Sequence, residues 1–123
     1  MIIRKCQVLE DTPSTFLDQV LNQSQAIPAI IDIDSISVSS YDTDTGLLAY
    51  TADFVVADTM EATFQLDEGW NRDKRGWNSN IVCGGEYWPE GGKTYRLEFS
   101  WFFGDGYIVR SVYEVQCIEL FGS

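Results

Sequence analysis

The sequence predicts an α+β protein: a mainly antiparallel sheet of about six strands, folded as a roll or a sandwich, with one N-terminal helix. Three observations lead to this class. Apolar and polar residues alternate along most of the chain, which is the period of half-buried strands. Glycine-containing turns separate the alternating runs, whereas one early segment repeats its apolar residues every four positions. The length of 123 residues favours one domain, residues 1–123.

The expected helix covers residues 11–26. Thr12 fits the N-cap, and Pro13 fits the first helical position, where a missing amide hydrogen costs nothing. Phe16 and Val20 stand four residues apart and form an apolar stripe. We therefore expect one helix face to pack on the sheet.

Four alternating runs predict strands on either side of this helix. The first covers residues 1–10, with three side chains expected to face inward: Ile3, Cys6 and Val8. The other runs, residues 29–41, 47–57 and 59–67, are expected to form an antiparallel meander with one solvated face. The apolar phase slips by one residue near Ser35, which predicts a β-bulge.

The clearest signal is a hairpin near the C-terminus. Gly104, Asp105 and Gly106 stand between two long runs of aromatic and β-branched residues, and they suit a tight turn. The inward positions of the first arm are Tyr95, Leu97, Phe99, Trp101 and Phe103. Their counterparts on the second arm are Val109, Tyr113, Val115 and Cys117.

Charge is distributed unevenly along the chain. The net charge is −11, and no lysine or arginine occurs between Cys6 and Asn71. That stretch holds twelve acids: Glu10, Asp11, Asp18, Asp32, Asp34, Asp42, Asp44, Asp53, Asp58, Glu61, Asp67 and Glu68. Such a surface repels free nucleic acid and anionic membranes.

The sequence lacks the residues that several catalytic mechanisms and metal sites require. The chain has no histidine, which removes Ser-His-Asp and Cys-His arrangements, so we expect no enzyme and no cofactor. Asp32 and Asp34 could hold a divalent ion, but nothing else indicates a metal site. The three cysteines lack metal-ligand spacing and are odd in number, which favours a reducing compartment. No run approaches the ~20 apolar residues of a membrane span. We expect a cytoplasmic protein, in its own cell or in a host.

An acidic face is the first candidate site. Adjacent meander strands would place five acids on one outer surface: Asp32, Asp34, Asp53, Glu61 and Asp67. Uncompensated like charges destabilise a sheet, so such a face either aids solubility or meets a basic partner. The second reading predicts a non-enzymatic inhibitor that docks on a basic, nucleic-acid-binding protein. By analogy, small acidic proteins of phages and mobile elements inhibit CRISPR or restriction machinery in this way.

The loop over residues 69–92 is the second candidate site. It holds aromatic and basic residues that could anchor a partner: Trp70, Arg72, Lys74, Arg75, Trp77 and Trp88. Exposed tryptophans would suit a carbohydrate- or ligand-binding β-module, whereas inward-packed ones would cap the sheet core. A third possibility is a structural component of a viral particle that assembles through strand edges.

Overall fold

The computed structural model describes residues 3–65 and 77–119. Strands make up 58% of it, and the only α-helix of the described chain is one short turn, α1 (Val56–Thr59). Two 3-10 turns accompany it, η1 (Ile30–Asp32) and η2 (Gly85–Tyr87). The strands are β1 (Ile3–Leu9), β2 (Ser14–Asp18), β3 (Ile33–Asp42), β4 (Leu48–Phe54), β5 (Met60–Gln65), β6 (Trp77–Cys83), β7 (Thr94–Phe103) and β8 (Ile108–Ile118).

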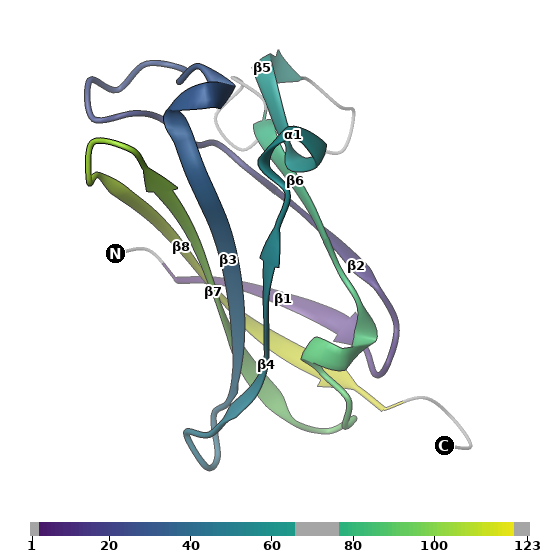
Figure 1. Ribbon diagram of the computed structural model, residues 1–123. Coiled ribbons are helices and arrows are strands. Elements are labelled where there is room, and N and C mark those ends of the chain that lie inside the picture. Colours follow the sequence, from purple (N-terminus) through teal and green to yellow (C-terminus); the bar gives the residue numbers. More distant parts are fainter. Residues whose placement is uncertain (1–2, 66–76, 120–123) are drawn as a thin grey trace.

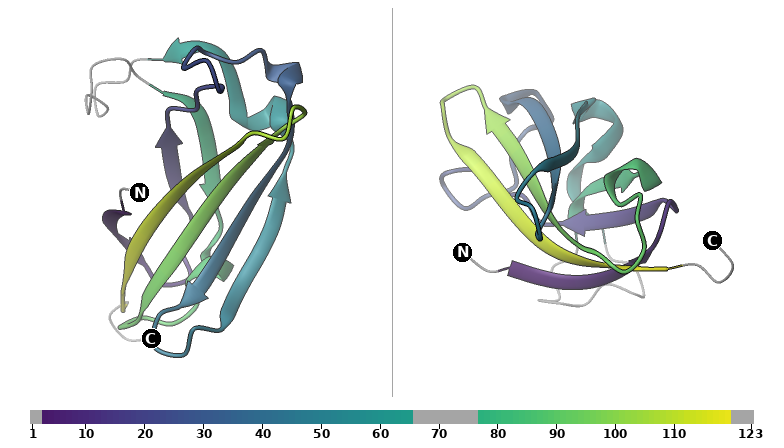
Figure 2. Two further views of the ribbon diagram at one scale, coloured as in Figure 1. Left: turned by 90° about the vertical axis from the view of Figure 1, so that its left-hand side faces the viewer. Right: turned by 90° about the horizontal axis from the view of Figure 1, so that it is seen from below.

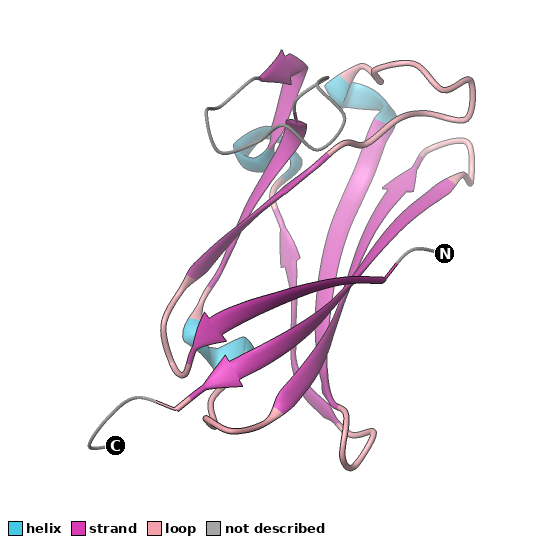
Figure 3. Cartoon of the chain, turned by 180° about the vertical axis from the view of Figure 1, so that it is seen from behind, coloured by secondary structure: helices cyan, strands magenta, loops and turns pink. Residues whose placement is uncertain are grey.

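The strands form two sheets that face one another (Figure 1; Figure 2). The larger sheet has the order β1-β8-β7-β3-β4, and the smaller has the order β2-β6-β5. β1 runs parallel to β8, and every other described pair is antiparallel. The predicted α+β class is therefore wrong, because the protein is mostly β, with strands predominating over short helical turns (Figure 3). Among the described residues, no helix is long and apolar enough to cross a membrane.

Aromatic side chains fill the space between the sheets. Phe16 of the smaller sheet lies against Phe99 and Tyr113 of the larger one, with ring centroids 5.2 and 4.9 Å apart. It also approaches Trp88, which is fully buried. Aromatic pairs at these distances stabilise a core beyond the area they bury.

The segment predicted as the N-terminal helix is instead β2 and the loop that follows it. Phe16, Asp18 and Val20 are buried in alternation, which is the period of a strand. The alternation is not visible in the sequence, because one of its three buried residues, Asp18, is an acid. The two apolar residues on either side of it, Phe16 and Val20, are four residues apart, which is the spacing of a helix. Thr12 caps no helix: its hydroxyl donates to the Glu10 carbonyl oxygen, and the preceding turn has Asp11 at a φ of 51°.

The predicted antiparallel meander is confirmed for β3 and β4, but it is wrong for β5. The register of β3 against β7 shifts between Ile33 and Ser35, which confirms the predicted bulge. β4 pairs with β3 as expected. After Phe54, however, α1 carries the chain to the other sheet, where β5 pairs with β6. The turn between β4 and β5 is thus a crossover between layers, and the two strands are not neighbours.

The C-terminal hairpin is confirmed. The Phe103 amide donates to the Tyr107 carbonyl oxygen at 2.9 Å, and Gly106 has a φ of 90°, which favours glycine. All five predicted inward positions of β7 are buried, as are Tyr113, Val115 and Cys117 of β8. The prediction for β1 is wrong at one position: Ile3 is exposed, and Arg4 takes the inward phase with Cys6 and Val8.

Candidate functional site

One end of the sandwich brings together three segments that are far apart in the sequence. They are the loop over residues 19–29, η1 with the start of β3, and the turn between β7 and β8 (Figure 1; Figure 2). The Gly104 amide donates to the Asp32 carbonyl oxygen at 3.1 Å and joins the turn to η1. Pairing of β3 with β7 brings the last two segments to the same end.

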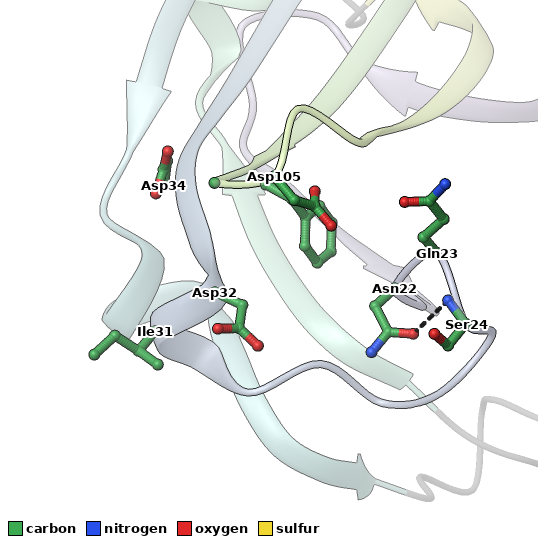
Figure 4. A pocket seen from close by; sticks show the side chains of 9 residues that line it. Asn22, Gln23, Ser24, Ile31, Asp32, Asp34 and Asp105 are labelled. Carbon is green, nitrogen blue, oxygen red and sulfur yellow. Dashed lines mark hydrogen bonds between the residues drawn. The ribbon is translucent and has the colours of Figure 1, made fainter.

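A cavity of about 460 Å³ opens between these segments (Figure 4). Its walls carry three carboxylates, from Asp32, Asp34 and Asp105. The remaining walls come from polar and apolar residues: Asn22, Gln23, Ser24, Ile31, Phe103 and Gly104. We call this cavity the aspartate pocket.

Local backbone features place each of the three carboxylates. Asp32 ends η1, and Asp34 lies in the β-bulge, where two successive residues are exposed. Gly104 leaves room for Asp34, because a Cβ at position 104 would lie 3.3 Å from Oδ1 of Asp34. Asp105 accepts the Tyr107 amide at 2.9 Å through its own Oδ1, a turn that aspartate favours.

The opposite wall is a loop held by its own hydrogen bonds. The side-chain oxygen of Asn22 accepts the amides of Ser24 and Ala26, both at 3.0 Å. Gln25 has a φ of 63°, so the loop turns sharply at this point. The carboxamides of Asn22 and Gln23 therefore stand across the pocket from Asp32 and Asp105 (Figure 4).

No described base lines the aspartate pocket. Its rim instead carries Ile31, which is 87% exposed. Within the described ranges, no group of three aspartate, glutamate, cysteine or histidine residues is arranged to hold a metal ion. The pocket thus combines negative charge, carboxamides and an exposed aliphatic side chain.

The described bases lie elsewhere, and Arg4, Lys93, Arg96 and Arg110 form side-chain hydrogen bonds or ion pairs there. Lys93 contacts Asp42 at 2.8 Å and Glu90 at 3.0 Å, and Arg96 contacts Glu98 at 2.8 Å. These contacts follow the outer sheet face and the end opposite the pocket. Three further bases complete the pattern: Arg110 donates to Ser100, Lys5 stands opposite Glu114, and Arg4 binds Asp18.

Asp18 is a second carboxylate site, buried between the sheets. It accepts hydrogen bonds from Arg4, from the Ser111 hydroxyl at 3.1 Å and from the Tyr113 hydroxyl at 3.0 Å. Burial raises the pKa of the Asp18 carboxyl, and the charge of Arg4 opposes that shift only in part. Since β2 carries Asp18 and β1 and β8 carry its partners, this cluster ties the two sheets together.

The cysteines are poor nucleophiles. Burial, with the nearby charge of Glu86, raises the pKa of the Cys83 thiol to about 12. Burial also raises the pKa of Cys6 and of Cys117. Thiols with such pKa values stay protonated at neutral pH and lack the thiolate that attacks substrates.

The predicted acidic residues are spread over several elements. Asp32 and Asp34 meet in the aspartate pocket, whereas Asp53 lies on the outer face of β4, opposite Ser37. Glu61 is exposed on β5 in the other sheet. Asp67 lies outside the described residues. The sheet face that carries Asp53 also carries Arg96 and Arg110, so it is of mixed charge.

The predicted loop residues fall into two groups. Trp77 begins β6 and is buried, and Trp88 is fully buried with its Nε1 donating to the Thr12 carbonyl oxygen at 2.9 Å. Both tryptophans therefore pack into the fold and do not stand on its surface. The other four lie outside the described residues: Trp70, Arg72, Lys74 and Arg75.

Sequence reasoning missed Asp105 as a pocket residue. The glycines around it identified the turn, but its neighbours depend on the long-range pairing of β3 with β7, which leaves no local pattern. Comparison with known proteins adds no assignment, because the chain matches no protein-family model and no curated protein sequence.

Proposed function

We propose that this is a non-enzymatic binding protein whose aspartate pocket receives a lysine or arginine side chain from a basic protein. One observation carries the proposal: Asp32, Asp34 and Asp105 line one cavity, with no base among its described walls. The absence of histidine and the raised thiol pKa values support binding without catalysis.

The pocket suits an organic cation with an aliphatic stem. Lysine and arginine bury their methylene groups on apolar surface while the charged end seeks acceptors. Ile31 and Phe103 offer such surface, and carboxylates form the strong, charge-assisted bonds that guanidinium and ammonium groups prefer. The side-chain oxygen of Gln23 provides a further acceptor, whereas that of Asn22 is already used by two backbone amides.

The partner class follows from charge. A net charge of −11 attracts basic surfaces, and a basic patch is the electrostatic signature of a nucleic-acid-binding protein. We therefore infer a small inhibitor, acting in the cytoplasm of its own cell or of a host, that occupies a nucleic-acid-binding surface by imitating phosphates. It would contact neither nucleic acid nor membrane directly. Phage-encoded inhibitors of CRISPR or restriction machinery share this strategy.

Two triple variants test the pocket with a labelled deca-arginine peptide. The pocket triple is Asp32→Asn, Asp34→Asn and Asp105→Asn. The control triple is Glu61→Gln, Glu114→Gln and Glu119→Gln, which removes the same charge from exposed acids of β5 and β8 and of the residue after β8, all outside the pocket. At about 0.15 M salt, where the Debye length is about 8 Å, fluorescence anisotropy should show a loss of about tenfold for the pocket triple and about twofold for the control. Equal losses would mean that binding follows net charge alone.

A further inference from the structure

The two sheets have four edge strands, and β4 is the least protected. Natural proteins keep edge strands from pairing with other chains by making them short, or by placing basic residues or inward-pointing charges on them. β1 carries Arg4 and Lys5, and β2 has five residues and turns Asp18 inward. β5 has six residues and a register shift against β6. β4 has seven residues with no base, proline or glycine.

Exposed apolar side chains gather on and around β4. Leu47, Leu48, Tyr50 and Val55 are among the ten exposed large hydrophobic residues of the described chain. β4 pairs with β3 on one side, and no described strand pairs with the other. Its free edge thus offers unpaired backbone groups beside apolar surface, which is the arrangement that accepts an added strand.

The acids at and around β4 indicate what kind of chain would pair with its free edge. Asp44 precedes β4 in the turn from β3, Asp53 lies near its end, and Asp58 follows in α1; all three are exposed. A second copy paired antiparallel about Thr51 would bring the end bearing Asp44 beside the end bearing Asp58, so that acids would meet acids. A basic segment would instead meet an acid at each end.

We propose that an extended, basic segment of the partner protein adds to β4 as a sixth, antiparallel strand of the larger sheet. This inference rests on the proposed function, because it takes a basic protein as the partner. Apolar residues of the segment cover Tyr50, which pairs with the buried Ser40, and the exposed Leu48 at the start of β4. Its basic residues face Asp53 and the two acidic ends.

The probe is an acetylated, amidated peptide of alternating valine and threonine with two lysines at each end. Its N-methylated form keeps the charge but cannot form the backbone ladder. Hydrogen exchange should slow in residues 48–54 when the first peptide is added, and the N-methylated peptide should bind at least tenfold more weakly. Equal binding of the two peptides, or protection only at residues 22–34 and 103–107, would overturn the proposal.

Charge variants separate this surface from the aspartate pocket. Asp53→Lys should weaken peptide binding about tenfold, since repulsion replaces attraction. Glu61→Lys, which makes the same change in the other sheet, should weaken it less than threefold. The pocket triple should keep the peptide's protection of residues 48–54 although its affinity for deca-arginine has fallen about tenfold. Slowed exchange in β4 that rises with protein concentration alone, with a dimer in sedimentation, would show that the occupant is a second copy.

Discussion

Two groups of aspartates in this chain have opposite surroundings. Asp18 is 2% exposed and has three donors, from Arg4, Ser111 and Tyr113. Asp32 and Asp34 are exposed, share a cavity with Asp105 and face no described base. The first arrangement satisfies a buried charge, and the second leaves charges open to a partner.

The contrast teaches that residue type alone does not separate structural from functional acids. A buried carboxylate without partners is costly, so the fold supplies Asp18 with a cation and two hydroxyls. Exposed carboxylates have water as a partner and need no such support. Asp32 and Asp34 therefore contribute little to stability, and we propose that they act in binding together with Asp105, which also accepts the Tyr107 amide of the hairpin turn.

The largest expected effect is the difference in unfolding free energy between the variants Asp18→Ala and Asp32→Ala. Loss of the Asp18 carboxylate leaves the partly buried Arg4 without its ion pair and two hydroxyls without their acceptor, which should cost about 3 kcal/mol of unfolding free energy. Asp32→Ala should change that free energy by less than about 0.5 kcal/mol. Urea unfolding measures both. Similar losses in the two variants would contradict the contrast.

Tyr113→Phe probes one bond of the Asp18 cluster. The ring and its contact with Phe16 remain, but the hydroxyl that donates to Asp18 at 3.0 Å is lost. Hydrogen bonds to charged groups contribute about 2 kcal/mol, so the unfolding free energy should fall by about that amount. Tyr107→Phe, at a half-exposed tyrosine of the hairpin, is the control and should be nearly neutral.

The pH dependence of stability should also identify Asp18. Burial raises its pKa in the folded state, so the folded protein binds a proton more readily than the unfolded chain does. The stabilisation that protonated Asp18 provides is complete below the unfolded pKa and is lost as the pH rises through the folded one. The difference in unfolding free energy between the wild type and Asp18→Asn should therefore shrink as the pH rises through this window. Growth of that difference with pH would contradict the assignment.

Gly104→Ala should give the smallest effect. A Cβ there would lie 3.3 Å from Oδ1 of Asp34, and the side chain of Asp34 can move aside. The unfolding free energy should fall by less than about 1 kcal/mol, while deca-arginine binding weakens about twofold because one carboxylate is displaced. Gly106→Ala is a useful contrast: its φ of 90° strains any side chain, so it should destabilise the hairpin more.

The sequence predicted features that depend on neighbouring residues. The bulge at Ser35 and the hairpin at Gly104 both follow from local alternation and turn chemistry, and both are present. The helix failed because Asp18 is a buried acid in a strand, and its partners Arg4 and Tyr113 come from the other sheet. No local pattern shows that a distant base will satisfy a charge.

The candidate site was predicted in part for the same reason. Asp32 and Asp34 were identified because they lie close together in the sequence. Asp105 lies beside them only because β3 pairs with β7. Asp53 does not line the pocket, because β4, which carries it, lies on the side of β3 away from β7. Strand order therefore decides which acids meet.

The most direct test of the central claim is a titration of the labelled protein with deca-arginine, followed residue by residue in NMR spectra. The account predicts that the largest shifts fall on residues 22–24, 31–34 and 103–105, which surround the three carboxylates. Shifts spread evenly over the exposed acids, with no maximum at this end of the sandwich, would contradict it.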